Sequence, residues 1–241
     1  MKAIPSLESI LSRETAAIAQ TMTSVEREDP DALKLVEQLK ERTGGARRVV
    51  VTGPPGVGKS SLLREVMRLL RERGETVGVL ACDPASPHTH GAFLGDRVRW
   101  SELGGDADIF VRSVAHRAES EFLPEVVWRF ADLLDASGFS WVLIETVGVG
   151  QTCTADSRRR AVRVLVLSPG SGDEIQMLKA GFLEDGDLYV VNKADLPGGL
   201  RWARQLEETL SLNQARPPRV LATVATTGEG VAELVEELSN Q

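Results

Sequence analysis

Short apolar runs alternate with longer amphipathic segments along most of this chain. Seven runs rich in valine, leucine and isoleucine lie at 47–52, 76–83, 108–113, 141–145, 162–167, 188–192 and 219–224. They do not alternate strictly between apolar and polar positions, which is typical of parallel strands buried on both faces. The segments between them, such as 60–73 and 121–134, repeat apolar residues at helical spacing. The pattern therefore predicts an α/β domain with a doubly wound, mostly parallel sheet.

A helical arm is predicted ahead of this domain. From residue 6 to about residue 39 the apolar positions have helical spacing, and Asp29 precedes Pro30 as a capping residue precedes a first-turn proline. We predict two helices in this stretch. The sequence TGGA at 43–46 then breaks the pattern. We therefore place an N-terminal helical arm at 1–46 and the α/β domain at 47–241.

Composition and charge narrow the classes of partner. The 241 residues include 28 lysines and arginines against 35 aspartates and glutamates, a formal net charge of −7. This acidic balance gives no basic surface for nucleic acid or an anionic membrane. No apolar stretch approaches the roughly 20 residues of a membrane span, and the first residues lack the apolar centre of a secretion signal. We therefore expect a cytoplasmic protein, unless a targeting segment was removed. Cys82 and Cys153 show no paired metal-ligand spacing and are too few for a disulfide scaffold, so we expect reduced thiols.

The sequence GPPGVGKSS follows the first predicted strand directly and precedes a predicted helix. It satisfies the phosphate-loop (P-loop) pattern G-x-x-x-x-G-K-[ST]. Glycines allow the backbone N–H groups to converge on phosphate oxygens, together with the positive end of the helix. The lysine adds a charge for the β- and γ-phosphates, and the following serine hydroxyl is placed to ligate Mg²⁺. The residues predicted to contact the nucleotide are Gly53, Gly56, Val57, Gly58, Lys59, Ser60 and Ser61.

A second motif predicts which base is bound. The sequence VVNKADL ends a late apolar run and contains N-K-x-D at Asn192, Lys193 and Asp195. An aspartate carboxylate can accept from both N–H groups on the ring-and-amino edge of guanine, whereas adenine offers no such pair of donors. The lysine stem can lie along the face of the base. In the exit of the next strand, ATVATTGEG, the backbone N–H of Ala225 is predicted to lie near the guanine carbonyl oxygen.

Acidic residues at strand ends are candidates for a metal site. Asp83 ends the second predicted strand, Asp96 lies in the loop beyond it, and Glu145 ends the fourth. Mg²⁺ bound with a nucleotide keeps several waters, so one or two carboxylates suffice. Glu145 is one methylene longer than aspartate, so we expect it to act on a direct ligand of the metal or through water. For Asp96 a solvated loop charge is an equal alternative. We expect His88 and His90 to be solvated rather than metal-binding.

The sequence after Glu145 predicts slow hydrolysis. Val149 stands in GVGQ where a water-orienting glutamine often occurs, and its side chain can neither donate nor accept a hydrogen bond. We therefore expect slow intrinsic turnover unless Gln151, Asp83 or a partner protein supplies the missing group. The candidate catalytic residues are Lys59, Asp83, Glu145 and Gln151.

Together these motifs resemble the MeaB/ArgK type of GTPase, the methylmalonyl-CoA mutase-associated GTPase chaperones. The resemblance rests on GPPGVGKSS, VLACDPASP, FLGDRVRW, WVLIETVGVGQ, SPGSGDEIQMLKAGFLEDGDLYVVNKADL and TGEGV. It implies a GTPase that binds GTP or GDP with Mg²⁺ and acts as a chaperone for an adenosylcobalamin-dependent mutase. Such a chaperone would gate cofactor loading and protect the mutase, which in turn would accelerate GTP hydrolysis. By motif match, the resemblance assigns guanine to the N-K-x-D residues and Mg²⁺ to Ser60, Asp83, Asp96 and Glu145.

The resemblance also implies where the mutase would act. The stretch GSGDEIQMLKAG is similar to the family's third switch loop, in which Asp173, Glu174, Gln176 and Lys179 would couple to the partner. Two features depart from the family: the stretch at 114–128 replaces a glycine-containing one, and His90 stands where a glycine is usual. Family members usually continue into a C-terminal helical dimerisation extension, which this sequence lacks after Gln241. We therefore expect a monomer or a weak homodimer.

Two other functions remain open from the sequence. A metallochaperone GTPase that delivers nickel would need a Cys/His cluster, which the sequence does not show. A kinase acting on a small acceptor, such as an amino acid or a transport protein, needs a positioned base and an acceptor pocket, and N-K-x-D is not expected in one. Competition between GTP and ATP for the site would distinguish these functions.

Overall fold

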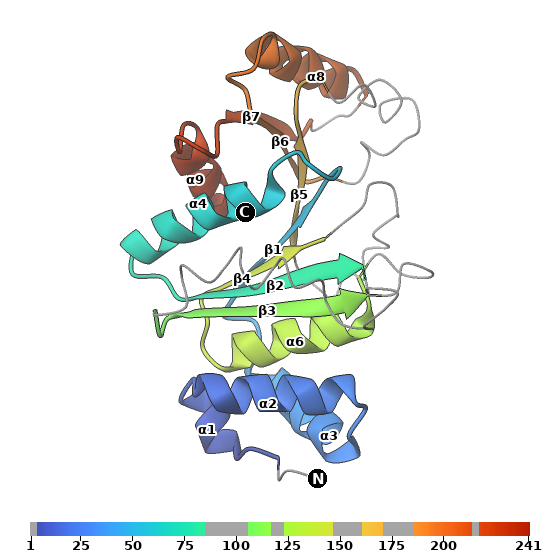
Figure 1. The fold of residues 1–241 in the computed structure, drawn as a ribbon, viewed down its shortest axis with the longest axis vertical. Helices are drawn as coiled ribbons and strands as arrows, with labels where there is room; N and C mark the ends of the chain where they lie inside the picture. The colour runs from blue at the N-terminus through green and yellow to red at the C-terminus, as the bar shows by residue number, and fades with distance from the viewer. Residues whose placement is uncertain (1–3, 85–105, 117–122, 147–160, 171–185, 214–216) are drawn as a thin grey trace. The chain divides into compact units, whose positions relative to one another are not determined.

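The structure is a computed structural model that describes residues 4–84, 106–116, 123–146, 161–170, 186–213 and 217–241 (Figure 1). By its internal contacts the chain divides into two compact units. The first comprises Met1–Arg48 with Gly74–Ile144, and the second comprises Val49–Arg73 with Glu145–Gln241. The predicted boundary between an arm and a domain at residue 46 stays a prediction.

The N-terminal arm is helical, but it contains three α-helices where two were predicted. They are α1 (Leu7–Leu11), α2 (Thr15–Glu26) and α3 (Pro30–Leu39), followed by the short 3-10 helix η1 (Lys40–Arg42). The unexpected break follows α1, where Arg13 adopts a left-handed φ of 60°. Glycine is the usual signal for such a break, and none is present there. The start of α3 is as predicted, because the Asp29 side chain accepts from the N–H groups of Asp31 and Ala32.

Helix α6 (Glu125–Ala136) joins the arm to the strands of the first unit. It packs against α2 and α3 and also against β2 (Val77–Pro84) (Figure 1). β2 pairs in parallel with β3 (Ile109–His116), from Val77 opposite Ile109 to Pro84 opposite His116. The third strand is β4 (Trp141–Glu145), and the strand order is β3-β2-β4. Gly78 allows α6 to approach β2 closely, because a Cβ there would lie 2.8 Å from a methyl carbon of Leu134.

Two arginines form ion pairs between the arm and the region of β3. The Arg112 guanidinium donates to the Thr23 hydroxyl at 3.2 Å and pairs with the Glu26 carboxylate on α2. Arg13 pairs with Asp108 at 3.1 Å, just ahead of β3. These pairs are partly exposed, so each contributes modestly to stability, and the apolar contacts of α2 and α3 with α6 supply the larger share.

The predicted breaker at 43–46 is a binding site for a carboxylate from α6. The backbone N–H groups of Gly44, Gly45 and Ala46 donate to Asp135 at 2.8, 3.1 and 3.0 Å. Arg48 donates to the same carboxylate at 2.8 Å, and it also donates to Asp132 at 2.7 Å. Asp135 is only 4% exposed, so its charge is stabilised almost entirely by these four donors. The connection into the first strand is therefore fixed to the end of α6.

The second unit is built on four parallel strands in the order β1-β5-β6-β7. They are β1 (Arg47–Thr52), whose first two residues belong to the first unit, β5 (Val162–Leu167), β6 (Leu188–Asn192) and β7 (Arg219–Thr223). Each neighbouring pair is parallel, with Val49 opposite Val162, Val164 opposite Leu188, and Leu188 opposite Arg219. The helices of this unit are α4 (Lys59–Glu72), α8 (Gly199–Asn213) and α9 (Val231–Asn240).

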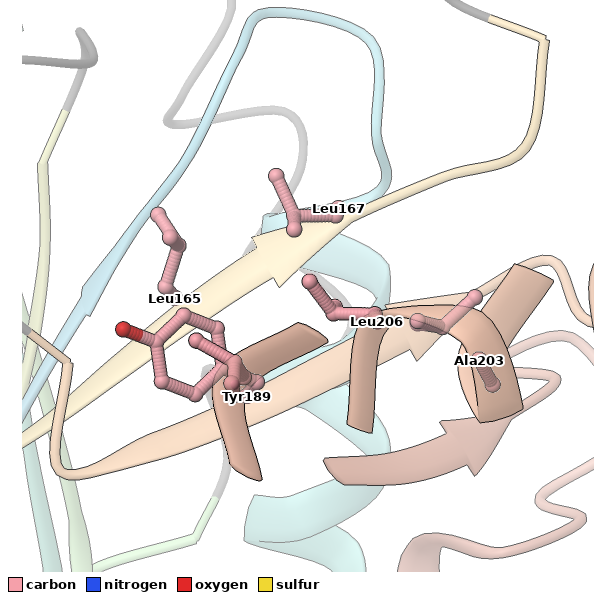
Figure 2. Packing of buried hydrophobic residues seen from close by; sticks show 7 residues of the cluster. Leu165, Leu167, Tyr189, Ala203 and Leu206 are labelled. Atoms are coloured by element: carbon pink, nitrogen blue, oxygen red, sulfur yellow. The ribbon is translucent and has the colours of Figure 1, made fainter. Parts of the chain in front are cut away.

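A cluster of buried apolar side chains holds α8 against β5 and β6. Figure 2 shows leucines of β5 and Tyr189 of β6 gathered against the side chains of α8. Tyr189 and Val191 are fully buried, so burial of this face contributes about 2 kcal/mol for each large side chain. The cluster consists of Leu165, Leu167, Tyr189, Val191, Ala203, Leu206 and Leu210. It fixes the strand that ends in Asn192.

The predicted α/β fold class is confirmed. All seven predicted strands are present, and four of them have the predicted bounds to the residue. The pairings among β1, β5, β6 and β7, and the pairing between β2 and β3, are parallel. Within the described residues, the structure contains no helix that is long and apolar enough to span a membrane.

Candidate nucleotide-binding site

The phosphate loop connects β1 to α4, and two of its glycines make close contacts. Gly53 has a φ of +146°, and a Cβ there would lie 2.1 Å from the Val166 carbonyl oxygen. Gly58 has a φ of +95°, and a Cβ there would lie 2.5 Å from Nδ2 of Asn192. Any side chain at either position would therefore meet both backbone strain and a neighbouring group. The loop depends on these glycines for its path as well as for its exposed N–H groups.

Lys59 opens α4 and turns back over the loop. Its side chain is 6% exposed, and Nζ donates to the carbonyl oxygens of Gly53 and Pro54 at 2.8 and 2.9 Å. The ammonium group is thereby held against the backbone of the loop, whose N–H groups the motif is expected to direct at phosphate. A concentrated positive field in a loop of this kind favours an anionic phosphate.

Ser60 and Glu145 come together, as the sequence predicted for a metal site. The Ser60 hydroxyl donates to Oε1 of Glu145 at 2.7 Å, joining the first turn of α4 to the end of β4. Hydroxyl and carboxylate oxygens are ligands that suit Mg²⁺, so these two residues fit that ion. In this contact the carboxylate reaches the hydroxyl that would ligate the metal, and the role of Glu145 at a metal ion stays a prediction.

Asn192 connects three loops of the second unit. Its Nδ2 donates to the Val57 carbonyl oxygen in the phosphate loop at 2.9 Å. Its Oδ1 accepts from the Thr223 hydroxyl at 3.2 Å and from the Ala225 N–H at 3.1 Å. Asn192 is 1% exposed, so these bonds form away from water and hold the side chain in one orientation. The loop predicted to read the base is thus fixed directly to the loop predicted to bind phosphate.

Lys193 makes a second connection to the phosphate loop. Its Nζ donates to the Gly56 carbonyl oxygen at 2.6 Å, so the stem of the side chain runs beside the loop. Its backbone has a φ of 58°, which is uncommon for a residue other than glycine and often marks a functional position. Asp195 follows on an exposed turn, which leaves its carboxylate accessible to a ligand.

The Ala225 N–H was predicted to lie near a guanine carbonyl oxygen. In the structure this N–H donates to Asn192 Oδ1, so its direct contact with a base stays a prediction. Sequence reasoning did not identify Thr223, whose buried hydroxyl orients Asn192. The only signal was its position at the end of a strand, two residues before Ala225, and many structural threonines share that position.

Several predicted site residues lie outside the described residues. The backbone of Asp83 lies in β2, one residue before its end at Pro84, but the Asp83 side chain belongs to this group. The others are Asp96, Val149, Gln151, Asp173, Glu174, Gln176 and Lys179, together with His88, His90 and Cys153. The structure therefore brings together Ser60 with Glu145, and the phosphate loop with the N-K-x-D loop. Among the described residues it contains no group of three or more His, Cys, Asp or Glu side chains that could hold a metal ion.

Known proteins resemble this chain over most of its length. The family described as "Methylmalonyl Co-A mutase-associated GTPase MeaB" matches residues 18–241. A putative GTPase of Pyrococcus horikoshii is 38% identical over 238 residues, which cover 96% of this chain and 75% of that protein. The GTPase ArgK of Escherichia coli K12 is 34% identical over 232 residues, with 92% of this chain and 70% of that protein covered. The crystal structure of a LAO/AO transport system kinase matches with a TM-score of 0.72 and 27% identity, covering 97% of this chain and 72% of that one.

Proposed function

We propose that this chain, which belongs to the MeaB family of methylmalonyl-CoA mutase-associated GTPases, is a GTP-driven switch. It would serve as a chaperone for a mutase. As a member of this family it is a GTPase. The observation that carries the proposal is the bond from Asn192 to Val57. It joins the loop assigned to the base to the loop assigned to the phosphates, which supports a site in which the identity of the base would influence how the phosphates are held.

The site would bind GTP or GDP through three sets of groups. The residues from Gly53 to Ser61, including Gly56 and Val57, would surround the phosphates with N–H donors, and Lys59 would add its charge. Asp195 would accept from the two N–H groups of guanine, with the stem of Lys193 against the face of the base. Ala225 would contribute its N–H near the guanine carbonyl oxygen if it exchanged Asn192 for the base.

Mg²⁺ would neutralise charge on the β- and γ-phosphates when bound. Ser60 is the residue placed to ligate it, and Glu145 would orient the Ser60 hydroxyl or a water. Asp83 and Asp96 are the further acidic groups assigned to this shell by motif.

Hydrolysis would be slow in the isolated protein. Lys59 would stabilise the charge that develops on the transferred phosphoryl group, whereas Val149 offers no group to orient the attacking water. Gln151 or Asp83 would take that role only in a particular arrangement, which a partner could impose. We therefore propose that the partner accelerates hydrolysis.

The partner we propose is an adenosylcobalamin-dependent acyl-CoA mutase, and the family's name supports this. The switch would gate loading of the cobalamin cofactor and protect the loaded enzyme. Asp173, Glu174, Gln176 and Lys179 would form the surface that transmits the nucleotide state to the mutase. The proposed location of both proteins is the cytoplasm.

A nucleotide competition assay tests the first part of this proposal. Labelled GDP bound to the purified protein should be displaced by unlabelled GTP and GDP, and at least about a hundredfold less effectively by ATP. Equal displacement by ATP would contradict both the guanine assignment and the switch. A pull-down with a non-hydrolysable GTP analogue, compared with GDP, should retain a cobalamin enzyme only in the GTP-like state.

A kinase activity is the second candidate, because one related solved structure is named a transport system kinase. The two activities differ in where the γ-phosphate goes. Incubation with γ-labelled GTP and either a mixture of amino acids or a transport protein should release inorganic phosphate alone if the protein is a switch. A labelled acceptor would favour the kinase.

A further inference from the structure

A short segment between β7 and α9, residues 224–230, is called the base loop below because it carries Ala225. The loop is closed by its own backbone: the Val224 N–H donates to Glu229 O, and the Gly228 N–H donates to Val224 O, both at 2.9 Å. One side of the loop is held by the bond from Ala225 to Asn192. Closure of this kind gives the loop a fixed shape, but its position also depends on what lies behind it.

A side chain of the phosphate-loop helix lies behind the base loop. Gly228 has a φ of +79°, and a Cβ there would lie 2.8 Å from Oε1 of Glu65 and 3.5 Å from its Cδ. The Glu65 carboxylate therefore occupies the space beside Gly228. Glu65 is on α4, and α4 packs against α9, the helix that the base loop begins.

Arg68 fixes this carboxylate in place. Its Nε lies 3.0 Å from each carboxylate oxygen of Glu65, and a terminal nitrogen lies 2.6 Å from Oε1. A guanidinium that contacts both oxygens fixes the plane of a carboxylate as well as its position. The Glu65 side chain is 19% exposed, against 50% for Arg68. Glu65 is thus held between Arg68 and Gly228.

The same helix begins with Lys59 and Ser60. Glu65 follows Ser60 by five residues, which is roughly 7.5 Å along a helix axis. A rigid helix therefore connects the groups assigned to phosphate and Mg²⁺ with a support for the loop assigned to the base.

We propose that Glu65 is a positioning residue of the guanine site, which sets the base loop at the correct distance from the phosphate loop through its contact with Gly228. The inference rests on the proposed function, because it concerns how that site holds guanine. Asn192 supports the base loop from the side of β6, and Glu65 supports it from the side of α4. Loss of the support from Glu65 should weaken binding of the base and leave binding of the phosphates unchanged.

Two glycines of this chain give a matched pair of variants. Gly228 and Gly74 both have a φ of +79°, so alanine meets the same backbone strain at each. A Cβ at Gly74 has no atom within 4 Å, whereas a Cβ at Gly228 would displace Glu65. Because the obstructing atom is the end of a side chain, Gly228→Ala should move the carboxylate and leave the loop folded.

The measurement is the release rate of fluorescent GDP from full-length protein that binds one equivalent. We expect Gly228→Ala and Glu65→Ala each to release GDP about five- to tenfold faster than the wild type, and Gly74→Ala to stay within about twofold. In the Glu65→Ala background, Gly228→Ala should add no more than Gly74→Ala does, because the two changes remove one contact. Glu65→Gln keeps the shape of the side chain and, with its oxygen in the place of Oε1, two of the three contacts with Arg68, so it should release GDP more slowly than Glu65→Ala.

A second readout separates positioning from general loosening. Pyrophosphate with Mg²⁺ engages only the phosphate end, so its affinity should be the same in all these proteins. If Gly228→Ala and Glu65→Ala release GDP at the rate of Gly74→Ala, the inference is wrong. It is also wrong if pyrophosphate binding falls in parallel with GDP binding. Should Gly228→Ala not fold, the comparison of Glu65→Ala with Glu65→Gln decides the matter.

The controls distinguish this inference from the proposed function. If the wild-type protein binds ADP as tightly as GDP, the guanine assignment fails and the role of Glu65 fails with it. If the wild type prefers GDP strongly and the variants keep its release rate, only the role of Glu65 fails.

Discussion

Replacement of Asp135 by asparagine tests how the N-terminal arm is joined to the rest of the first unit. The carboxylate accepts from three consecutive backbone N–H groups and from Arg48. An asparagine oxygen in the place of Oδ1 would keep the bonds from Gly45 and Ala46. Its NH₂ group would stand in the place of Oδ2, facing the Gly44 N–H and the Arg48 guanidinium, so that donors would face donors.

The expected cost follows from burial and from what Arg48 retains. Removal of one partner from a buried ion pair costs about 3 to 5 kcal/mol. Arg48 is 10% exposed at its side chain and keeps its pair with Asp132 at 2.7 Å, which places the loss at the lower end, about 3 kcal/mol. Asp132→Asn is the matched control, because Asp132 is 18% exposed and Arg48 would keep Asp135. We expect about 1 kcal/mol for that change.

Urea unfolding followed by circular dichroism measures the difference in the free energy of unfolding between the two variants. In thermal unfolding, the midpoint temperature should fall by roughly 6 to 12 °C for Asp135→Asn. Hydrogen exchange gives a local check, because the Gly44 amide, which loses its acceptor, should lose protection in this variant alone. The reasoning fails if the two variants unfold within about 0.5 kcal/mol of one another, or if the Gly44 amide exchanges as slowly as in the wild type.

Three further outcomes are expected. Lys59→Ala should abolish measurable binding of GDP and GTP while leaving the circular dichroism spectrum unchanged; binding within about tenfold of the wild type would contradict the placement of the phosphate site. Thr223→Val removes the hydroxyl that orients Asn192 at 3.2 Å and should weaken GDP about fivefold, the equivalent of about 1 kcal/mol, by calorimetry; Thr209→Val removes an exposed hydroxyl that donates to the Gln205 carbonyl oxygen on α8, and as the control it should change GDP affinity by less than about twofold. Phosphate release from GTP should be slow for the protein alone and rise at least about tenfold with the proposed mutase partner, so that fast turnover without a partner would refute the expected role of Val149.

The fold could be predicted from the sequence because its strands are short, valine-rich and bounded by turns. β1, β4, β5 and β6 begin and end at the predicted residues, since burial on both faces leaves a continuous apolar run that polar or glycine residues terminate. The arm was harder. Its first helix ends at Leu11, and two residues later Arg13 adopts a left-handed backbone that residues other than glycine normally avoid. No local signal marks the break.

Some residues of the candidate site could likewise be predicted from the sequence, and others could not. Motifs with fixed spacing identified the phosphate loop and Asn192, because the backbone geometry they require is encoded within a few neighbouring residues. Thr223 and Glu65 were not identified, since each acts through a contact with a residue far away in the chain. Such roles depend on how helices and strands pack, and the local pattern of a single sequence does not reveal which distant residues come into contact.

The hydrogen bond between Ser60 and Glu145 gives the serine oxygen a direction. A hydroxyl has one hydrogen and two lone pairs, and here the hydrogen is already directed at Oε1 of Glu145. What remains on the other side of the oxygen can only accept. This oxygen is therefore presented as a ligand before any ion arrives, and a cation can bind to it while the bond to Glu145 stays in place.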